Sequence, residues 1–204
     1  MFSKVQIIFQ ELAFKFEAIP ESRKEILKKI STYIQGKKEQ GLPINLVFIC
    51  THNSRRSHFG QVAAAVAAYY YGIENVRVFS GGTEATAFHS NAIQALNHLG
   101  FEVTTADQNI KNPLWLVRFG ENATTTCFSK VYNHPSNPPK DFAAIMTCSD
   151  ADQNCPVIFG AELRVGTTYQ DPKSSDGTPL ESQTYSARFL QIATEMMYVF
   201  SLIK

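Results

Sequence analysis

One stretch of the sequence decides the fold: Val47-Phe48-Ile49-Cys50-Thr51-His52-Asn53-Ser54-Arg55-Arg56-Ser57. A mostly apolar run, from Ile44 to Ile49, ends at a cysteine, and a helix-prone run of small residues begins after Arg56 and Ser57. This order predicts a buried strand, a tight loop and a helix. Such a loop directs several backbone N–H groups at one point, and the helix adds the positive end of its dipole. The stretch therefore predicts a binding site for a tetrahedral oxyanion.

The side chains of this loop suit chemistry on the bound anion. Arg56 can hold two of its oxygens with the planar guanidinium, and Cys50 would lie beside them in a positive field that favours the thiolate. A thiolate beneath an oxyanion can attack the central atom and form a covalent intermediate. The alternative is an inert cysteine at a strand end, with Arg56 in solvent, but the strand and helix on either side favour the chemical site. The anion is expected to contact the whole loop: Thr51, His52, Asn53, Ser54, Arg55, Arg56 and Ser57.

Length and composition are typical of a globular protein with one main domain. The 204 residues have a hydrophobic fraction of 44% and a formal net charge of +1, which argues against a nucleic-acid binder or a membrane-surface protein. No apolar run approaches the roughly 18 residues that span a bilayer, and no secretory signal is evident. Four cysteines in a chain of this length do not indicate a disulfide framework. We expect a cytoplasmic protein in which some cysteines are reactive.

Periodic patterns divide the chain into an N-terminal helical extension, residues 1–43, and an α/β domain, residues 44–204. Apolar residues at helical spacing predict two helices in the extension, over residues 5–16 and from Glu21 to about Gly36. They would form a hairpin with one apolar face. We favour packing of this face on the domain, and the alternative is a homodimer or partner interface.

The domain alternates strands with helices, which predicts a three-layer, doubly wound sheet of mainly four parallel strands. Ligands of such sheets bind beyond the carboxyl ends of the strands, where Cys50 falls. Residues 113–132 interrupt this order and are expected to insert a β-hairpin, and Gly81-Gly82 is expected to form a turn. The expected core strands are 44–49, 75–80, 142–147 and a short one around 163–165; the helices are 57–71, 89–99 and 180–203; and the hairpin strands are 114–119 and 125–131.

The loop Cys50-Thr51-x-Asn53-Ser54-x-Arg56-Ser57 resembles the phosphate-binding loop of low-molecular-weight protein tyrosine phosphatases. It resembles still more that of the thioredoxin-coupled arsenate reductases, which share the fold. The resemblance extends from about Ile44 to the C-terminus and leaves out the extension.

Three residues depart from the pattern of these families. His52 stands where glycine is usual, and a left-handed backbone there would be strained. Arg55 stands where arsenate reductases often have cysteine, and we expect it to face solvent. Gln61 stands where some relatives have a glutamate that helps to hold potassium, so we infer no ion site.

Two further cysteines, Cys148 and Cys155, lie seven positions apart after a predicted strand. Without more Cys or His nearby they make a poor zinc site, so no metal is expected. They could be buried, inert residues, as Cys127 on the hairpin is expected to be. The resemblance instead implies a relay. Cys50 attacks arsenate, Asp171 protonates the leaving oxygen, and Cys148 attacks the adduct, so that arsenite leaves and a disulfide forms. Cys155 then attacks Cys148, and thioredoxin, an external reductant rather than a bound cofactor, reduces that pair.

Asp171-Pro172 has a physical argument of its own, because the oxygen that leaves needs a proton and a carboxylic acid can supply it. Pro172 stiffens that loop.

Taken together, the loop, the cysteine pair and Asp171 favour an arsenate reductase. The alternative is a low-molecular-weight protein tyrosine phosphatase, in which the same Cys50, Arg56 and Asp171 hydrolyse a phosphomonoester through a phosphocysteine. A third interpretation is a non-catalytic oxyanion sensor. A phosphatase would need aromatic walls around the substrate ring, which four residues could form: Phe119, Phe128, Tyr132 and Tyr169.

Overall fold

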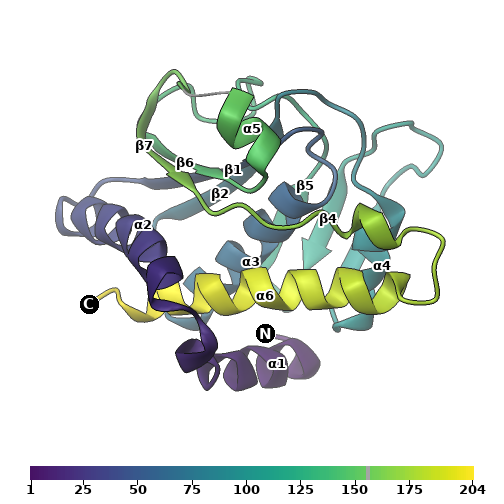
Figure 1. Ribbon diagram of the computed structural model, residues 1–204, viewed down its shortest axis with the longest axis horizontal. Coiled ribbons are helices and arrows are strands. Elements are labelled where there is room, and N and C mark those ends of the chain that lie inside the picture. Colours follow the sequence, from purple (N-terminus) through teal and green to yellow (C-terminus); the bar gives the residue numbers. More distant parts are fainter. Residues whose placement is uncertain (155–156) are drawn as a thin grey trace.

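The computed structural model describes residues 1–154 and 157–204 and shows an α/β protein (Figure 1). Its main sheet has four parallel strands in the order β2-β1-β6-β7. The predicted parallel sheet is thus confirmed. The strands are β1 (Ile44–Cys50), β2 (Val76–Gly82), β6 (Phe142–Met146) and β7 (Ala161–Gly166).

Helices cover both faces of this sheet, which confirms the three layers. On one face lie α3 (Arg56–Tyr70), α4 (Ser90–His98) and the long α6 (Glu181–Ser201), while the short α5 (Ser149–Asn154) lies on the other (Figure 1). The central strand β1 is buried on both faces, because Leu46 and Phe48 belong to the large core under α3 and α6 whereas Val47 and Ile49 belong to a smaller cluster under α5. This is the continuous apolar pattern of a strand in the middle of a parallel sheet.

The predicted hairpin forms, but it is part of a separate antiparallel sheet of three strands in the order β3-β4-β5. These strands are β3 (Glu102–Thr105), β4 (Trp115–Arg118) and β5 (Thr124–Cys127). Strand β3 was not predicted. The second hairpin strand ends at Cys127, not at Val131, because the chain then turns towards the loop after β1: the Lys130 amide donates to Asn53 Oδ1 at 2.8 Å, and the Lys130 carbonyl accepts from Gly82 N at 2.8 Å.

The N-terminal extension forms the two predicted helices, with different ends. The helices are α1 (Ser3–Ala13) and α2 (Glu21–Glu39), joined through a short 3-10 turn η1 (Phe16–Ala18). The predicted end of α2 near Gly36 is wrong: the helix continues to Glu39, and the chain leaves it at Gly41, whose φ of 65° is the left-handed conformation typical of helix ends.

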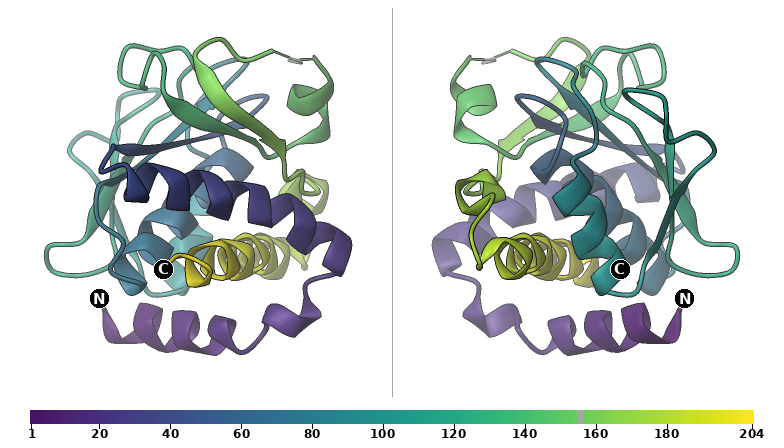
Figure 2. Two further views of the ribbon diagram at one scale, coloured as in Figure 1. Left: turned by 90° about the vertical axis from the view of Figure 1, so that its left-hand side faces the viewer. Right: turned by 90° about the vertical axis from the view of Figure 1, so that its right-hand side faces the viewer.

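The apolar faces of both N-terminal helices pack on α6, and α1 lies beneath it (Figure 2). The side chains buried in this way belong to the same large core as α3 and α6: Val5, Phe9, Leu12, Leu27, Ile30 and Ile34. The face that was considered as a dimer interface is therefore covered within one chain.

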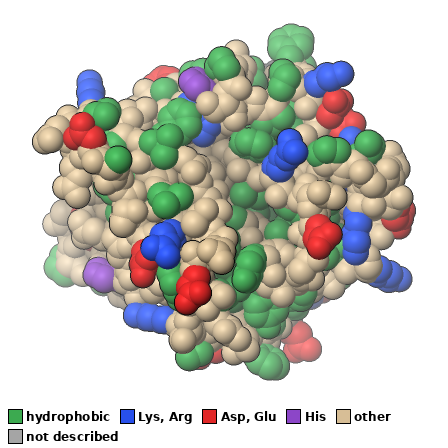
Figure 3. All heavy atoms as spheres, turned by 180° about the vertical axis from the view of Figure 1, so that it is seen from behind, with side chains coloured by type: hydrophobic (Ala, Val, Ile, Leu, Met, Phe, Trp, Pro, Cys, Tyr) green, Lys and Arg blue, Asp and Glu red, His purple; other side chains and the backbone are tan. Residues whose placement is uncertain are grey.

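No helix in the described part of the chain is long and apolar enough to cross a membrane. On the face seen in Figure 3, basic and acidic side chains are scattered among polar and apolar ones, in keeping with the formal net charge of +1.

Candidate active site

Cys50 ends strand β1 at the carboxyl edge of the sheet and is 4% exposed. Its Sγ lies 3.1 Å from the hydroxyl of Ser57, in the first turn of α3. Asn53 Nδ2 donates to the same Ser57 oxygen at 2.8 Å. Since that oxygen accepts from Asn53, the Ser57 proton is free to point at the sulfur, where it stabilises a thiolate. Asn53 and Ser57 thus brace the sulfur through hydrogen bonds.

The left-handed residue of the loop is Asn53, with φ of 44°, and not His52 as the resemblance suggested. Asparagine tolerates this conformation better than most residues. Both ends of its side chain are used, because Nδ2 bonds Ser57 and Oδ1 accepts from the Lys130 amide. The His52 side chain points outward, is 50% exposed, and lies 3.8 Å from Glu84.

Gly82 supports the loop from below, so the predicted turn at Gly81-Gly82 is wrong: both glycines belong to β2. The chain after β2 holds the loop through its backbone, since Thr83 N donates to Cys50 O at 3.2 Å and Glu84 N donates to Thr51 O at 2.8 Å. A Cβ atom on Gly82 would lie only 2.5 Å from Thr51 O and 2.8 Å from the Asn53 nitrogen. Glycine is needed at this position because the loop passes directly against the strand.

Arg56 begins α3 and is 8% exposed. Its Nη1 donates to the Tyr169 carbonyl at 2.9 Å, and its Nη2 donates to Asp171 Oδ2 at 2.7 Å. Its buried Nε has no hydrogen-bond partner among the described residues. The amides of residues 51–55 likewise donate to no protein acceptor within the described part of the chain. These unused donors at a helix N-terminus are what an oxyanion requires.

Asp171, which the resemblance suggested as the acid, lies beside Arg56. It precedes the 3-10 turn η2 (Pro172–Ser175), and its Oδ1 accepts from the Lys173 amide at 3.0 Å. The Asp171 side chain is 32% exposed, so it can exchange protons with solvent while it contacts Arg56.

Arg55 does not face solvent, and that prediction is wrong. Its side chain is 11% exposed, donates from Nε to the Tyr185 hydroxyl at 2.8 Å, and lies 3.4 Å from Asp176 Oδ2. The Tyr185 hydroxyl in turn donates to Asp176 Oδ1 at 2.7 Å. Although desolvation opposes the charge, this hydrogen bond and the Arg55 guanidinium lower the pKa of Asp176. Nothing in the spacing of the sequence connected α6 to the loop.

Cys148 follows β6, the strand next to β1, so it lies at the same edge of the sheet as Cys50. It is fully buried, its Sγ lies 3.4 Å from the Thr51 hydroxyl, and the Ala151 amide donates to it at 3.4 Å. The helix α5 that follows was not predicted. Cys155 lies outside the described residues.

Of the other predicted residues, Cys127 and Phe119 lie away from this site, and Tyr169 contributes only its carbonyl, which accepts from Arg56. Cys127 is fully buried, and burial raises the pKa of its thiol to about 12, as suits a structural residue. Phe119 and Tyr169 are buried in the core, so they cannot form walls around a substrate ring, whereas Phe128 and Tyr132 are half-buried. No group of three His, Cys, Asp or Glu side chains among the described residues could hold a metal ion.

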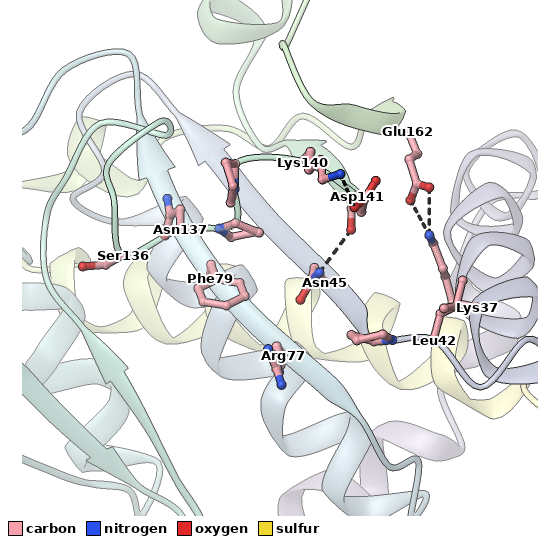
Figure 4. Close-up of a pocket in the computed structure, with 13 residues that line it drawn as sticks. Lys37, Leu42, Asn45, Arg77, Phe79, Ser136, Asn137, Lys140, Asp141 and Glu162 are labelled. Atoms are coloured by element: carbon pink, nitrogen blue, oxygen red, sulfur yellow. Dashed lines mark hydrogen bonds and ion pairs between the residues drawn. The ribbon is translucent and has the colours of Figure 1, made fainter.

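A cavity of about 600 Å³ lies near the starts of β1 and β2, not at the carboxyl edge (Figure 4). Asn45, which lines it, precedes Cys50 by five residues on the same strand, roughly 17 Å at 3.3 Å per residue. The same view shows Lys37 of α2 paired with Glu162 at the start of β7, at 2.7 Å. The cavity and this ion pair are therefore separate from the candidate active site.

A buried thiol under a loop of unused amide donors, with an arginine and a carboxylate at its rim, is an arrangement that suits attack by a cysteine on a bound oxyanion. No family model matches the chain. It is 28% identical over 127 residues to arsenate reductase 2 of Staphylococcus epidermidis, covering 62% of this chain and 77% of that protein. It is 26% identical over 143 residues to an arsenate reductase of Bacillus subtilis, covering 70% and 84%.

The fold is similar to that of a low-molecular-weight protein tyrosine phosphatase from T. tengcongensis, with a TM-score of 0.54 and 13% identity over 78% of this chain and 98% of that one. The chain is thus similar in sequence to arsenate reductases and shares the fold of low-molecular-weight protein tyrosine phosphatases. These similarities fit an enzyme of the oxidoreductase or hydrolase type.

Proposed function

We propose that this protein reduces arsenate to arsenite, with Cys50 as the nucleophile and Cys148 as the second thiol. The contact between Cys148 Sγ and the Thr51 hydroxyl, at 3.4 Å, supports this function most, because it places a second sulfur against the oxyanion loop. Hydrolysis of a phosphomonoester needs a nucleophile, an arginine and an acid, but no second thiol. The similarity to curated arsenate reductases adds support.

The first step uses donors that are unused in the protein. Arsenate would accept hydrogen bonds from the amides of residues 51–55 and from Arg56 Nε, above Cys50. The Cys50 thiolate forms a bond to arsenic, one As–O bond breaks, and Asp171 gives its proton to the oxygen that leaves as water. Arg56 holds the Asp171 carboxylate at the rim of the loop as an ion pair at 2.7 Å, where it can reach the oxygen that leaves.

The second step transfers two electrons to arsenic. The Cys148 thiolate attacks Cys50 Sγ, an S–S bond forms, and the electron pair of the broken S–As bond stays on arsenic, which leaves as arsenite. Attack of Cys155 on Cys148 would return Cys50 to the thiolate and move the disulfide to Cys148 and Cys155. We propose thioredoxin as the dithiol that reduces this last pair.

The test is single-turnover reduction of arsenate by the pre-reduced protein, with the free thiols counted before and after. We expect one arsenite and the loss of two thiols per chain, and no arsenite from Cys148→Ser. Cys127→Ser is the matched control, since that thiol is equally buried but lies outside the site, and it should behave as the wild type. If no arsenite forms, and steady hydrolysis of an aryl phosphate survives Cys148→Ser, the protein is a phosphatase that acts through a phosphocysteine.

A further inference from the structure

A buried ion pair connects the N-terminal extension to the C-terminal helix. Arg23, in the first turn of α2, donates from Nε and Nη2 to the two carboxylate oxygens of Glu195 on α6, at 3.0 and 2.8 Å. The two side chains are 17% and 5% exposed. A bidentate pair in this environment fixes the geometry of both partners.

The same pair holds the segment between β7 and η2. We name residues 167–171 the acid loop, because it ends at Asp171. The Tyr169 hydroxyl donates to Glu195 Oε2 at 2.6 Å, and the Arg23 guanidinium lies 4.8 Å from the Tyr169 ring centroid. Arg23 Nη2 also donates to the Thr167 carbonyl. Burial, and then the Glu195 charge, keep the pKa of Tyr169 well above its ordinary value, so its hydroxyl remains a donor.

The acid loop carries both groups that hold Arg56. The Tyr169 carbonyl accepts from Arg56 Nη1, and the Asp171 carboxylate accepts from Arg56 Nη2. Tyr169 is therefore held by its ring and hydroxyl from one side, and it holds Arg56 with its carbonyl on the other. A shift of this loop would move both acceptors of Arg56 together.

We propose that Arg23 is a positioning residue for the oxyanion site: through Glu195 and the acid loop it sets the positions of Arg56 and Asp171. This inference rests on the proposed function for its catalytic consequence, but its effect on oxyanion binding can be measured without reduction. It also assigns a role to α2, which precedes the part of the chain that resembles the superfamily.

The experiment removes the ion pair without leaving a lone buried charge. In the double variant Arg23→Met and Glu195→Gln, the amide oxygen of the new glutamine side chain can still accept from the Tyr169 hydroxyl. The hydrogen bond from Arg23 to the Thr167 carbonyl is lost. Removal of both charges avoids the penalty of one unpaired ion. The matched control is Lys37→Met with Glu162→Gln, which removes another ion pair of α2 to β7 that does not touch the acid loop.

Affinity for inorganic phosphate is measured by calorimetry, and arsenite release by single turnover. We expect the Arg23 and Glu195 double variant to bind phosphate about tenfold more weakly and to release arsenite correspondingly more slowly, a size typical of coupling through packed, hydrogen-bonded contacts. Arg23→Lys should recover part of the affinity, because an ammonium can face Glu195 but cannot bond both carboxylate oxygens and Thr167 as a guanidinium does. The Lys37 and Glu162 double variant should match the wild type.

Two readouts separate this inference from the proposed function. If the double variant binds phosphate and releases arsenite as the wild type does, the positioning role is wrong. If the wild type binds phosphate but releases no arsenite, the proposed reduction is wrong, and the phosphate affinities still decide the role of Arg23. If the double variant folds poorly, Tyr169→Phe tests the same connection, because it removes the hydroxyl that bonds Glu195 and keeps the carbonyl that holds Arg56. A phosphate affinity equal to that of the wild type in Tyr169→Phe would contradict the connection through Glu195.

Discussion

Gly82→Ala tests whether close contact with β2 shapes the oxyanion loop. The new Cβ would lie 2.3 Å from Glu84 O and 2.5 Å from Thr51 O, whereas ordinary contacts begin at 3.4 Å. Both oxygens belong to the backbone and must retreat by about 1 Å, the difference between those values. Overpacking of this kind costs about 2 kcal/mol in the free energy of unfolding, which lowers Tm by roughly 4–8 °C for a chain of this length. Because a misplacement of about 1 Å can cost on the order of 100-fold in activity, phosphate affinity should fall by at least about tenfold.

The assay combines urea unfolding with phosphate calorimetry, and Gly36→Ala is the control. A Cβ at Gly36 meets nothing within 4 Å and lies inside α2, so this variant should be more stable, by about 0.5–1 kcal/mol, and should bind phosphate unchanged. The reasoning is refuted if Gly82→Ala keeps both the stability and the phosphate affinity of the wild type. Loss of stability with unchanged affinity would show that β2 supports the fold but not the shape of the loop.

Three further predictions concern single side chains. Ser57→Ala removes the hydroxyl at 3.1 Å from Cys50 Sγ, and alkylation of that thiol by iodoacetamide at pH 6 should slow by about tenfold while phosphate binding changes little. Burial lowers the pKa of His58 to about 3, so between pH 6.5 and 3 the unfolded chain binds a proton that the folded chain does not. The free energy of unfolding of the wild type, measured by urea titration, should therefore fall by about 2 kcal/mol from pH 6.5 to 5, and that of His58→Gln should fall less. Burial also lowers the pKa of Lys130 to about 8, so between pH 8 and 10.5 the unfolded chain still binds a proton that the folded chain has lost. Over this range the stability of the wild type should therefore rise relative to that of Lys130→Met, measured by urea titration at each pH.

The oxyanion loop could be predicted because its parts are contiguous. The strand, the cysteine, the arginine and the helix start all lie between Ile44 and Tyr70, and hydrophobic periodicity reads such local order well. The neighbouring strand β6 could also be predicted, since a second buried run ends just before Cys148. Parallel strands share their carboxyl edge, but the approach of Cys148 to the loop was implied by the resemblance, since the position of β6 beside β1 was not predicted.

Contacts between distant residues could not be predicted. Arg55 meets Tyr185 across 130 positions and Arg23 meets Glu195 across 172, and no periodicity encodes such pairs. Each of these residues has an ordinary local interpretation: an arginine in a polar loop, or a charged residue on an amphipathic helix. Strand β3 was missed for a different reason, because its short sequence, Glu102–Thr105, becomes a strand by pairing with β4. The left-handed residue was assigned one position too early, since both His52 and Asn53 tolerate that conformation.

The balance between reduction and hydrolysis depends on which nucleophile reaches the Cys50 adduct first. Water approaches from the exposed rim, where Asp171 lies, and a carboxylate that has given up its proton can activate that water. Cys148 instead lies fully buried under α5, and an ion pair between Asp152 and Arg164 at 2.8 Å connects α5 to β7. In the proposed second step the sulfur would exchange its contact with the Ala151 amide for a bond to Cys50, which would move the start of α5. In the proposed reaction, reduction requires Cys148 to reach the Cys50 adduct before water does, so we expect the contacts that hold Cys148 under α5 to decide which reaction follows the first step.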